Sequence, residues 1–317
     1  MRLLATLTLA LAATLAHAQS YPSRPIKIIV PFGAGGPADI FARFLGKEME
    51  GPLGQPVVVE DKPGGGSIIG SDAVAKSAPD GYTLLMMSNT HTVNETLIPK
   101  KPFVLLRDLA PVAPVNYSDL LLVVHPSVRA NNLQELIALA KREPGKMNYA
   151  SSGPGTPYHM AGELLKSMAG IDVVHIPHKG SDGARLSILS GQVQMMFDAI
   201  TTMAPNVRAG KLKGFGTSGR ARSSVLPEVP TVAEAGVPGY ESTIWLGVMA
   251  PAGTPKPIID RLNAEITKVT SRADVREAWG KRGATAMSMT PEQFGQYMRD
   301  DIAKWEKVIA GAGIKRD

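Results

Sequence analysis

IKIIVPFGAGGPAD, residues 26–39, contains a strand, a tight loop and the start of a helix. The β-branched residues at 26–30 favour a buried strand. Gly33, Gly35 and Gly36 permit close turns of the backbone, and Pro37 suits the first position of a helix. The same arrangement recurs at residues 147–157, which read MNYASSGPGTP. The sequence therefore predicts two strand–loop–helix units of one kind.

Both loops suit an acidic ligand. The first turn of a helix has backbone N–H groups without internal partners and the positive end of the helix dipole, so it can hold an anion. The second loop adds the hydroxyls of Ser151, Ser152 and Thr156, which can hydrogen-bond a carboxylate. An ordinary turn explains each loop alone, and Thr156-Pro157 is also typical of an N-cap and first helical residue. Two such ends that face each other predict a carboxylate-binding protein.

Short apolar strands alternate with amphipathic helices, which predicts an α/β protein with largely parallel sheets. We expect strands at 26–30, 57–60, 83–87, 148–150, 173–176, 193–197, 212–216 and 245–250, with extended segments at 109–115 and 120–124. Expected helices cover 38–50, 68–76, 133–141, 158–168, 184–190 and 203–209. After residue 250 only helices are expected, with apolar faces at 258–269 and 294–309.

A helical tail after an α/β domain usually packs on an earlier sheet. This predicts a discontinuous first domain, residues 19–122 and 247–317, with residues 123–246 inserted as a second domain. Residues 120–124 and 244–250 would then cross between two lobes. Ligands of such proteins bind between the lobes, at the carboxyl ends of strands.

The first 18 residues have the pattern of a secretory signal peptide: a basic start at Arg2, an apolar run at 3–15 and a small-residue cleavage site at 16–18. The chain has no cysteine, so we expect neither disulfides nor a lipid anchor. We therefore expect an exported protein of the periplasm. The formal net charge is only +6 and aromatic residues make up 5%, with the basic residues scattered, which argues against nucleic-acid binding.

Other polar loops follow predicted strands. Residues 88–92 could line a pocket or form a turn, and residues 178–183 could bring a third set of donors or place Ser181 as an N-cap. The glycine-rich loop 63–67 is explained as well by a flexible surface loop. His159 could approach the ligand or cap its helix. Asp198 ends an apolar strand, where it could pair with a ligand ammonium, hold a water molecule or cap a helix.

Several chemistries lack their motifs. The GFGTSG segment at 214–219 is not followed by a convincing helix, so it does not indicate a dinucleotide site. His175 and His178 have no third ligand for a metal, and no GxSxG nucleophile motif occurs. We expect no cofactor, no metal and no catalytic residue. The candidate ligand-binding residues are Phe32, Gly33, Ala34, Gly35, Gly36, Asp39, Ser88, Asn89, Ser151, Ser152, Gly153, Thr156, His159, Lys179, Gly180 and Asp198.

Motifs along the whole chain are those of a known family. They include YPSRPI at 21–26, VPFGAGG at 30–36, KPGGG at 62–66, PDGYTL at 79–84, SSGPGT at 151–156, LPEVPT at 226–231 and APAGTP at 250–255. With them the chain resembles the substrate-binding proteins of tripartite tricarboxylate transporters, often called Bug proteins.

The resemblance implies a two-lobed periplasmic binding protein fold, type II-like, with two crossing strands as a hinge. It implies a non-enzymatic, monomeric receptor that delivers a small carboxylate to integral membrane transporter subunits. Loops 32–39 and 151–157 match the family's binding loops, and Asp198 matches an acid near the pocket. Ala38 and His178 depart from the usual Thr and aromatic residue, so the ligand's identity does not follow. A sensor that docks on a signalling receptor and a periplasmic hydrolase or isomerase are the alternatives.

Overall fold

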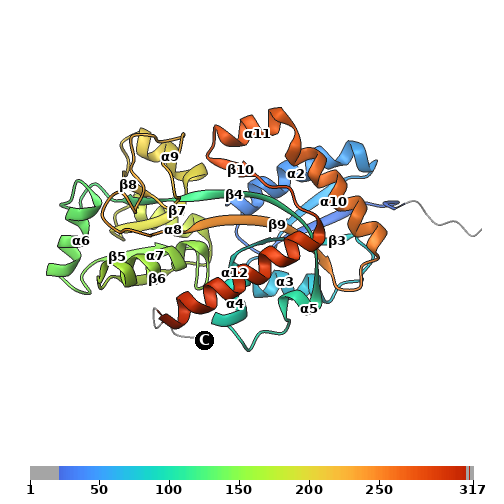
Figure 1. Cartoon of the computed structure of the whole chain (residues 1–317), viewed down its shortest axis with the longest axis horizontal. Helices are drawn as coiled ribbons and strands as arrows, with labels where there is room; N and C mark the ends of the chain where they lie inside the picture. The colour runs from blue at the N-terminus through green and yellow to red at the C-terminus, as the bar shows by residue number, and fades with distance from the viewer. Residues whose placement is uncertain (1–20, 312–313, 315–317) are drawn as a thin grey trace, which may run out of the picture.

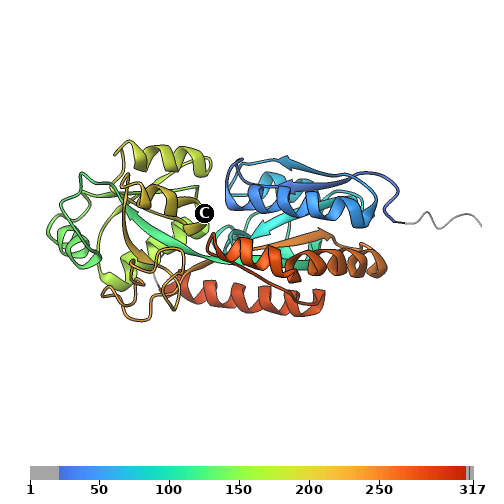
Figure 2. The same cartoon turned by 90° about the horizontal axis from the view of Figure 1, so that it is seen from above.

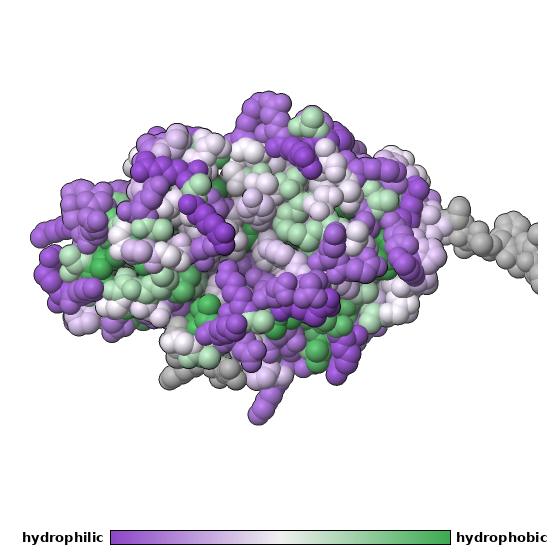
Figure 3. All heavy atoms as spheres, in the orientation of Figure 1, coloured by the Kyte–Doolittle hydropathy of each residue, from purple (hydrophilic) through white to green (hydrophobic). Residues whose placement is uncertain are grey.

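The computed structural model describes residues 21–311 and residue 314. The predicted signal peptide, residues 1–18, lies outside this part of the chain. Within it, none of the helices is both long and apolar enough to span a bilayer. Figures 1 and 2 show two lobes joined by two long strands, and Figure 3 shows hydrophilic side chains over much of one face of both lobes. The two-lobed arrangement expected from the sequence is confirmed.

The first lobe is built on three parallel strands in the order β2–β1–β3, followed by the antiparallel strands β9 (Thr243–Pro251) and β4 (Leu109–Val124). Its elements from the first part of the chain are β1 (Ile26–Val30), α2 (Pro37–Leu53), β2 (Val57–Asp61), α3 (Ile68–Ala75), β3 (Thr83–Ser88), α4 (Thr90–Leu97) and α5 (Leu105–Asp108). The buried faces of β1 and α2, with Ile28, Phe41 and Leu45, form the core of this lobe.

The second lobe repeats the design around parallel strands β6–β5–β7. Its elements are α6 (Leu133–Arg142), β5 (Asn148–Ser151), α7 (Pro157–Ala169), β6 (Val174–Pro177), α8 (Ser181–Leu189), β7 (Met195–Ala199), α9 (Ile200–Arg208) and β8 (Lys213–Thr217). Tyr149, Leu165 and Phe197 belong to its main core. The strands and helices predicted in both lobes begin and end within three residues of the observed ones.

One strand, β4 (Leu109–Val124), serves both lobes. Its residues 109–119 pair with β9 (Thr243–Pro251), whereas residues 120–124 pair with β7 and β8. The two extended segments predicted at 109–115 and 120–124 are therefore one strand. The expected largely parallel sheet is wrong in this respect, because every pair made by β4 and β9 is antiparallel. The exact division at residues 122/123 and 246/247 stays a prediction.

The last part of the chain returns to the first lobe. It forms α10 (Lys256–Ser271), α11 (Ala273–Gly280), β10 (Ala284–Ala286) and α12 (Pro291–Gly311). Trp279 of α11 packs edge-to-face on Phe41 of α2 at 4.9 Å between ring centres, which fixes the tail on the first core. The expectation of helices only is wrong at β10, which is too short for a pattern and forms because it pairs with residues 116–118 of β4.

Candidate ligand-binding site

The two glycine loops form helix starts, as predicted. Helix α2 has Gly36 as its N-cap, with no side chain capping its first turn. Helix α7 has Thr156 as its N-cap, and the Thr156 hydroxyl accepts a hydrogen bond from the His159 N–H at 3.4 Å. Pro follows at the first position of each helix. The free N–H groups of the first turn of α2 therefore remain available to a ligand.

Both loops line one cavity of about 710 Å³. The N-cap residues of four helices lie in its wall: Gly36 of α2, Ser67 of α3, Thr156 of α7 and Gly180 of α8. Two of these helices come from each lobe. Because the positive ends of four helix dipoles meet here, the cavity is suited to an anion.

The side chains around the cavity also favour an anionic ligand. Among the described residues that line it, none is acidic, while Lys179 supplies a positive charge. Much of the remaining wall is apolar and includes Phe32, Ile244 and Leu246. Such a wall accommodates a carbon skeleton, and the helix ends fix the position of a charged group.

The lobes touch at two rims of the cavity. At one rim, a Cβ atom on Gly33 would lie 3.9 Å from the Cα of Gly180. At the other, a Cβ on Gly155 would lie 2.4 Å from the Oδ1 of Asn94. A Cβ would fit at Gly33 as an ordinary van der Waals contact, whereas at Gly155 only glycine leaves room for the Asn94 side chain of the other lobe. The two lobes are thus in contact on both sides of the cavity.

The structure brings nine of the predicted residues to the cavity wall: Phe32, Gly33, Gly36, Ser88, Ser152, Gly153, Thr156, Lys179 and Gly180. The other seven lie outside the wall: Ala34, Gly35, Asp39, Asn89, Ser151, His159 and Asp198. Most of these seven hold the loops or strands that carry the wall residues.

Asp39 secures the first loop. Its Oδ2 accepts a hydrogen bond from the Gly35 N–H at 2.9 Å, and its Oδ1 lies 2.5 Å from the Nε of Arg43. This explains why a short acidic residue occupies the first turn of α2. Asn89 has a related role, because its Nδ2 donates to the carbonyl of Thr243 at 2.9 Å and so connects the end of β3 to β9.

Ser151 and His159 support the second loop from behind. The Ser151 hydroxyl is fully buried, lies 2.6 Å from the Nε2 of His175 and accepts the Gly153 N–H at 3.2 Å. The Nδ1 of His159 accepts the Gly155 N–H at 3.1 Å, and its ring stacks on that of His175. Burial lowers the pKa of His175 to about 3, so the His175 ring is neutral at ordinary pH.

Asp198 has a partner that the sequence did not indicate. It is fully buried at the end of β7, and its Oδ2 accepts a hydrogen bond from the Nε of Arg185 at 2.6 Å. Its Oδ1 accepts the Ala199 N–H at 2.7 Å. A ligand ammonium is therefore not needed to balance its charge. Tyr158, in contrast, lines the cavity, and burial, followed by the charge of Asp198, raises the pKa of its hydroxyl.

Sequence reasoning underrated three features of the wall. The loop 63–67, explained as a flexible surface loop, lines the cavity from one side. Tyr158 and Ser181 also line it, within two residues of the N-caps of α7 and α8. The polar segment 88–92, interpreted as a pocket edge or a turn, begins helix α4 and brings Ser88 and Thr90 to the wall. Their positions in the sequence could have identified these wall segments, because each one follows the end of a strand on the cleft side.

A second cavity of about 580 Å³ lies beside the crossing strands. It is lined by charged side chains, among them Asp119, Arg220, Arg222 and Glu241. Arg220 and Glu241 form an ion pair at 2.7 Å. Over residues 21–311 and 314, no group of three or more potential metal ligands occurs at either cavity.

The fold and the helix-lined cavity between the lobes define a two-lobed solute-binding protein. A model of the tripartite tricarboxylate transporter family receptor matches residues 41–314. The chain therefore belongs to this family of substrate-binding receptors, and the resemblance to Bug proteins is confirmed.

Solved structures agree with this assignment. The periplasmic binding protein BugD is 31% identical, with a TM-score of 0.89, covering 94% of this chain and 100% of that one. An R. palustris protein with adipate is 30% identical, with a TM-score of 0.90, covering 93% and 99%. MatC from Rhodopseudomonas palustris, with bound malate, is 32% identical, with a TM-score of 0.86, covering 91% and 100%.

Proposed function

We propose that this protein captures a small carboxylate between its lobes and delivers it to the membrane subunits of a tripartite tricarboxylate-type transporter. The observation that carries the proposal is the meeting of four helix N-termini at one cavity whose described wall contains no acidic side chain. The proposed ligand contacts are the nine predicted residues that lie in the wall, together with Tyr158 and Ser181.

The ligand's chemistry follows from the charges around the cavity. One carboxylate accepts hydrogen bonds at the starts of α2 and α7, and the apolar wall receives the carbon skeleton. The ammonium group of Lys179 can bind a second acidic or polar group of the ligand. Because Arg185 already balances Asp198, the site favours a ligand without an ammonium group. Relatives bound to adipate and malate support this class of ligand.

The cellular setting follows from the family and the first residues of the chain. We propose that residues 1–18 direct export, that the mature protein works as a monomer in the periplasm, and that it binds its ligand without chemical change. No cofactor is needed for this role, because backbone N–H groups and hydroxyls supply the binding contacts.

Native mass spectrometry of protein purified from the periplasm without refolding tests the function. The expected result is a one-to-one complex whose extra mass is that of a small carboxylic acid. After removal of the ligand, a thermal-shift screen should identify carboxylates that raise Tm. Stabilisation by amino acids or sugars, with no response to any carboxylate, would contradict the proposal.

A further inference from the structure

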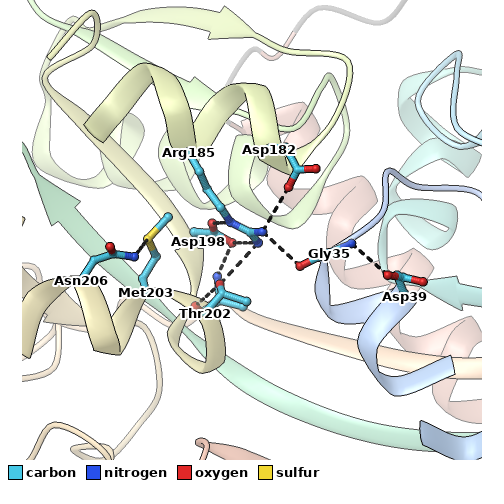
Figure 4. A network of polar contacts seen from close by, with 9 residues as sticks. Gly35, Asp39, Asp182, Arg185, Asp198, Thr202, Met203 and Asn206 are labelled. Atoms are coloured by element: carbon cyan, nitrogen blue, oxygen red, sulfur yellow. Dashed lines mark hydrogen bonds and ion pairs between the residues drawn. The ribbon is translucent and has the colours of Figure 1, made fainter. Parts of the chain in front are cut away.

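Arg185 makes two kinds of contact at once. Within the second lobe, its guanidinium forms a forked pair with Asp198, through Nε to Oδ2 at 2.6 Å and Nη2 to Oδ1 at 3.3 Å. Across the cleft, its Nη1 donates to the carbonyl of Gly35 in the first lobe at 3.2 Å. Figure 4 shows Arg185 between Asp198 and Gly35, with Asp39 on the far side of the glycine.

The Asp198 pair fixes where the guanidinium points. Asp198 is fully buried and the Arg185 side chain is 15% exposed, so the pair is held in one geometry. Burial alone would lower the pKa of Arg185, yet the charge and hydrogen bonds of Asp198 raise it above its ordinary value. The remaining nitrogen of the guanidinium, Nη1, therefore stays protonated and donates its N–H towards the first lobe.

The receiving peptide is also fixed. Gly35 has a φ of 72°, and its N–H is held by Asp39. Its carbonyl is thus presented from a loop whose neighbours Gly33 and Gly36 line the cavity. This contact joins two lobes, so it forms only when the cleft is closed. In an open arrangement both groups would be solvated instead.

The network also reaches the ligand wall. Tyr158 and Ser181 line the cavity, and Asp198 lies close enough to the Tyr158 hydroxyl for its charge to raise the pKa of that group. Asp198 therefore joins the wall of the cavity to the contact that closes it. Arg185 itself is not in the wall, so it would act through these neighbours and not by touching the ligand.

We propose that Arg185 is an affinity-determining positioning residue, which ties Asp198 in the second lobe to the Gly35 carbonyl in the first and slows the opening of the closed cleft. This rests on the proposed function, because the affinity it sets is that for the carboxylate ligand. Since the contact exists only in the closed form, its loss should appear chiefly in the rate of ligand dissociation.

Two variants test the role without leaving a buried charge unpaired. Arg185→Lys keeps a positive charge beside Asp198 but lacks the fork needed to reach both partners. The double variant Arg185→Met with Asp198→Asn removes the pair altogether. Arg222→Met is the matched control, because Arg222 also joins a carboxylate, that of Glu234, and a carbonyl, that of Pro227, within the second lobe.

The readouts are the dissociation constant, the dissociation rate and an interlobe distance. The chain has no cysteine, so spin labels can be placed at Lys47→Cys on α2 and Leu189→Cys on α8. Figure 2 shows these two helices in different lobes, α2 in blue and α8 in yellow-green. The probe ligand is the carboxylate that stabilises the wild-type protein most.

Both Arg185 variants should bind about tenfold more weakly, through faster dissociation, because a charged hydrogen bond is lost. Their label distances should shift towards longer values, while Arg222→Met behaves as wild type. Wild-type dissociation rates and distances in both variants would overturn the proposal, as would an equal loss in Arg222→Met. If the wild type bound no carboxylate, the proposed function would fail. The label distances in the unliganded proteins would then still test the role of Arg185. Longer distances in both Arg185 variants would support it, and wild-type distances would overturn it.

Discussion

The two cavities between the lobes have similar volumes, about 710 and 580 Å³, but opposite chemistry. The first receives four helix N-termini, and no described acidic residue lines it. The second is lined by Asp119 and Glu241 with two arginines, of which Arg220 pairs with Glu241 and Arg222 with Glu234. Positive helix ends favour an anionic ligand, whereas a wall with charges of both signs, several of them already paired, does not.

The comparison teaches that size alone does not identify the site. A cavity at a hinge is expected wherever two lobes meet, and polar side chains fill such a space as well as a ligand does. What distinguishes the first cavity is the convergence of four helix starts, held there by glycine loops from both lobes. The following changes should therefore affect the two cavities in different ways.

The largest effect is expected from Gly155→Ala. A Cβ there would meet the Asn94 Oδ1 at 2.4 Å, and Asn94 is held by its Nδ2 bond to the Gly66 carbonyl. The lobes could not close fully, so carboxylate affinity should fall about a hundredfold, which corresponds to about 2.7 kcal/mol. Titration calorimetry measures the change.

Gly170→Ala is the control for Gly155→Ala. Gly170 has a φ of 61°, close to the 71° of Gly155, but nothing lies within 4 Å of its added Cβ. Both variants should lose about 1 kcal/mol of stability through backbone strain. Only Gly155→Ala should lose affinity, and equal affinities in the two variants would show that closure at this rim does not matter for binding.

A change in the second cavity should alter stability and leave binding intact. Burial, followed by the charge of Glu241, raises the pKa of Asp119 to about 6. The ionised carboxylate therefore weakens the folded state above pH 6, and this cost disappears below the unfolded value near 4. Asp119→Asn should raise the free energy of unfolding by about 2 kcal/mol at pH 7.5.

Urea unfolding at several pH values checks the Asp119 prediction. The difference between variant and wild type should be largest above pH 6 and close to zero at pH 4. Carboxylate affinity should not change. A loss of affinity in Asp119→Asn would mean that the second cavity takes part in binding.

The smallest effect is expected from Lys179→Ala. Lys179 lines the first cavity, but a partly solvated charge contributes only about 0.2–1 kcal/mol. Affinity should fall by about fivefold or less and the loss should shrink in high salt. Arg220→Ala, in the second cavity, should have no effect. Abolished binding in Lys179→Ala would assign the carboxylate to a side chain and not to the helix ends.

Local rules predicted the two main loops because glycine, proline and N-cap chemistry act within a few residues. Residues 33–36 and 151–157 could therefore be identified, including their helix starts. Helix α4 was missed because its polar sequence gives no apolar period. It is held by tertiary contacts such as the Thr92 hydroxyl donating to Asp301 at 2.5 Å.

Asp198 shows the limit of this reasoning most clearly. Its place near the end of an apolar strand could be predicted from the sequence. Its partner Arg185 lies on α8, and only the packing of α8 against the sheet brings the two together. The long strand β4 was likewise split in the prediction, because pairing on both lobes, and not its own sequence, keeps it continuous.

Calorimetric titration with matched pairs of ligands tests the central claim most directly. Each pair consists of a carboxylate and the neutral primary amide of the same carbon skeleton, offered to the wild-type protein. The helix ends should bind at least one carboxylate in a one-to-one complex and its amide at least a hundredfold more weakly. Equal affinity for acid and amide across all pairs would contradict the account, because the helix ends would then contribute no anion selectivity.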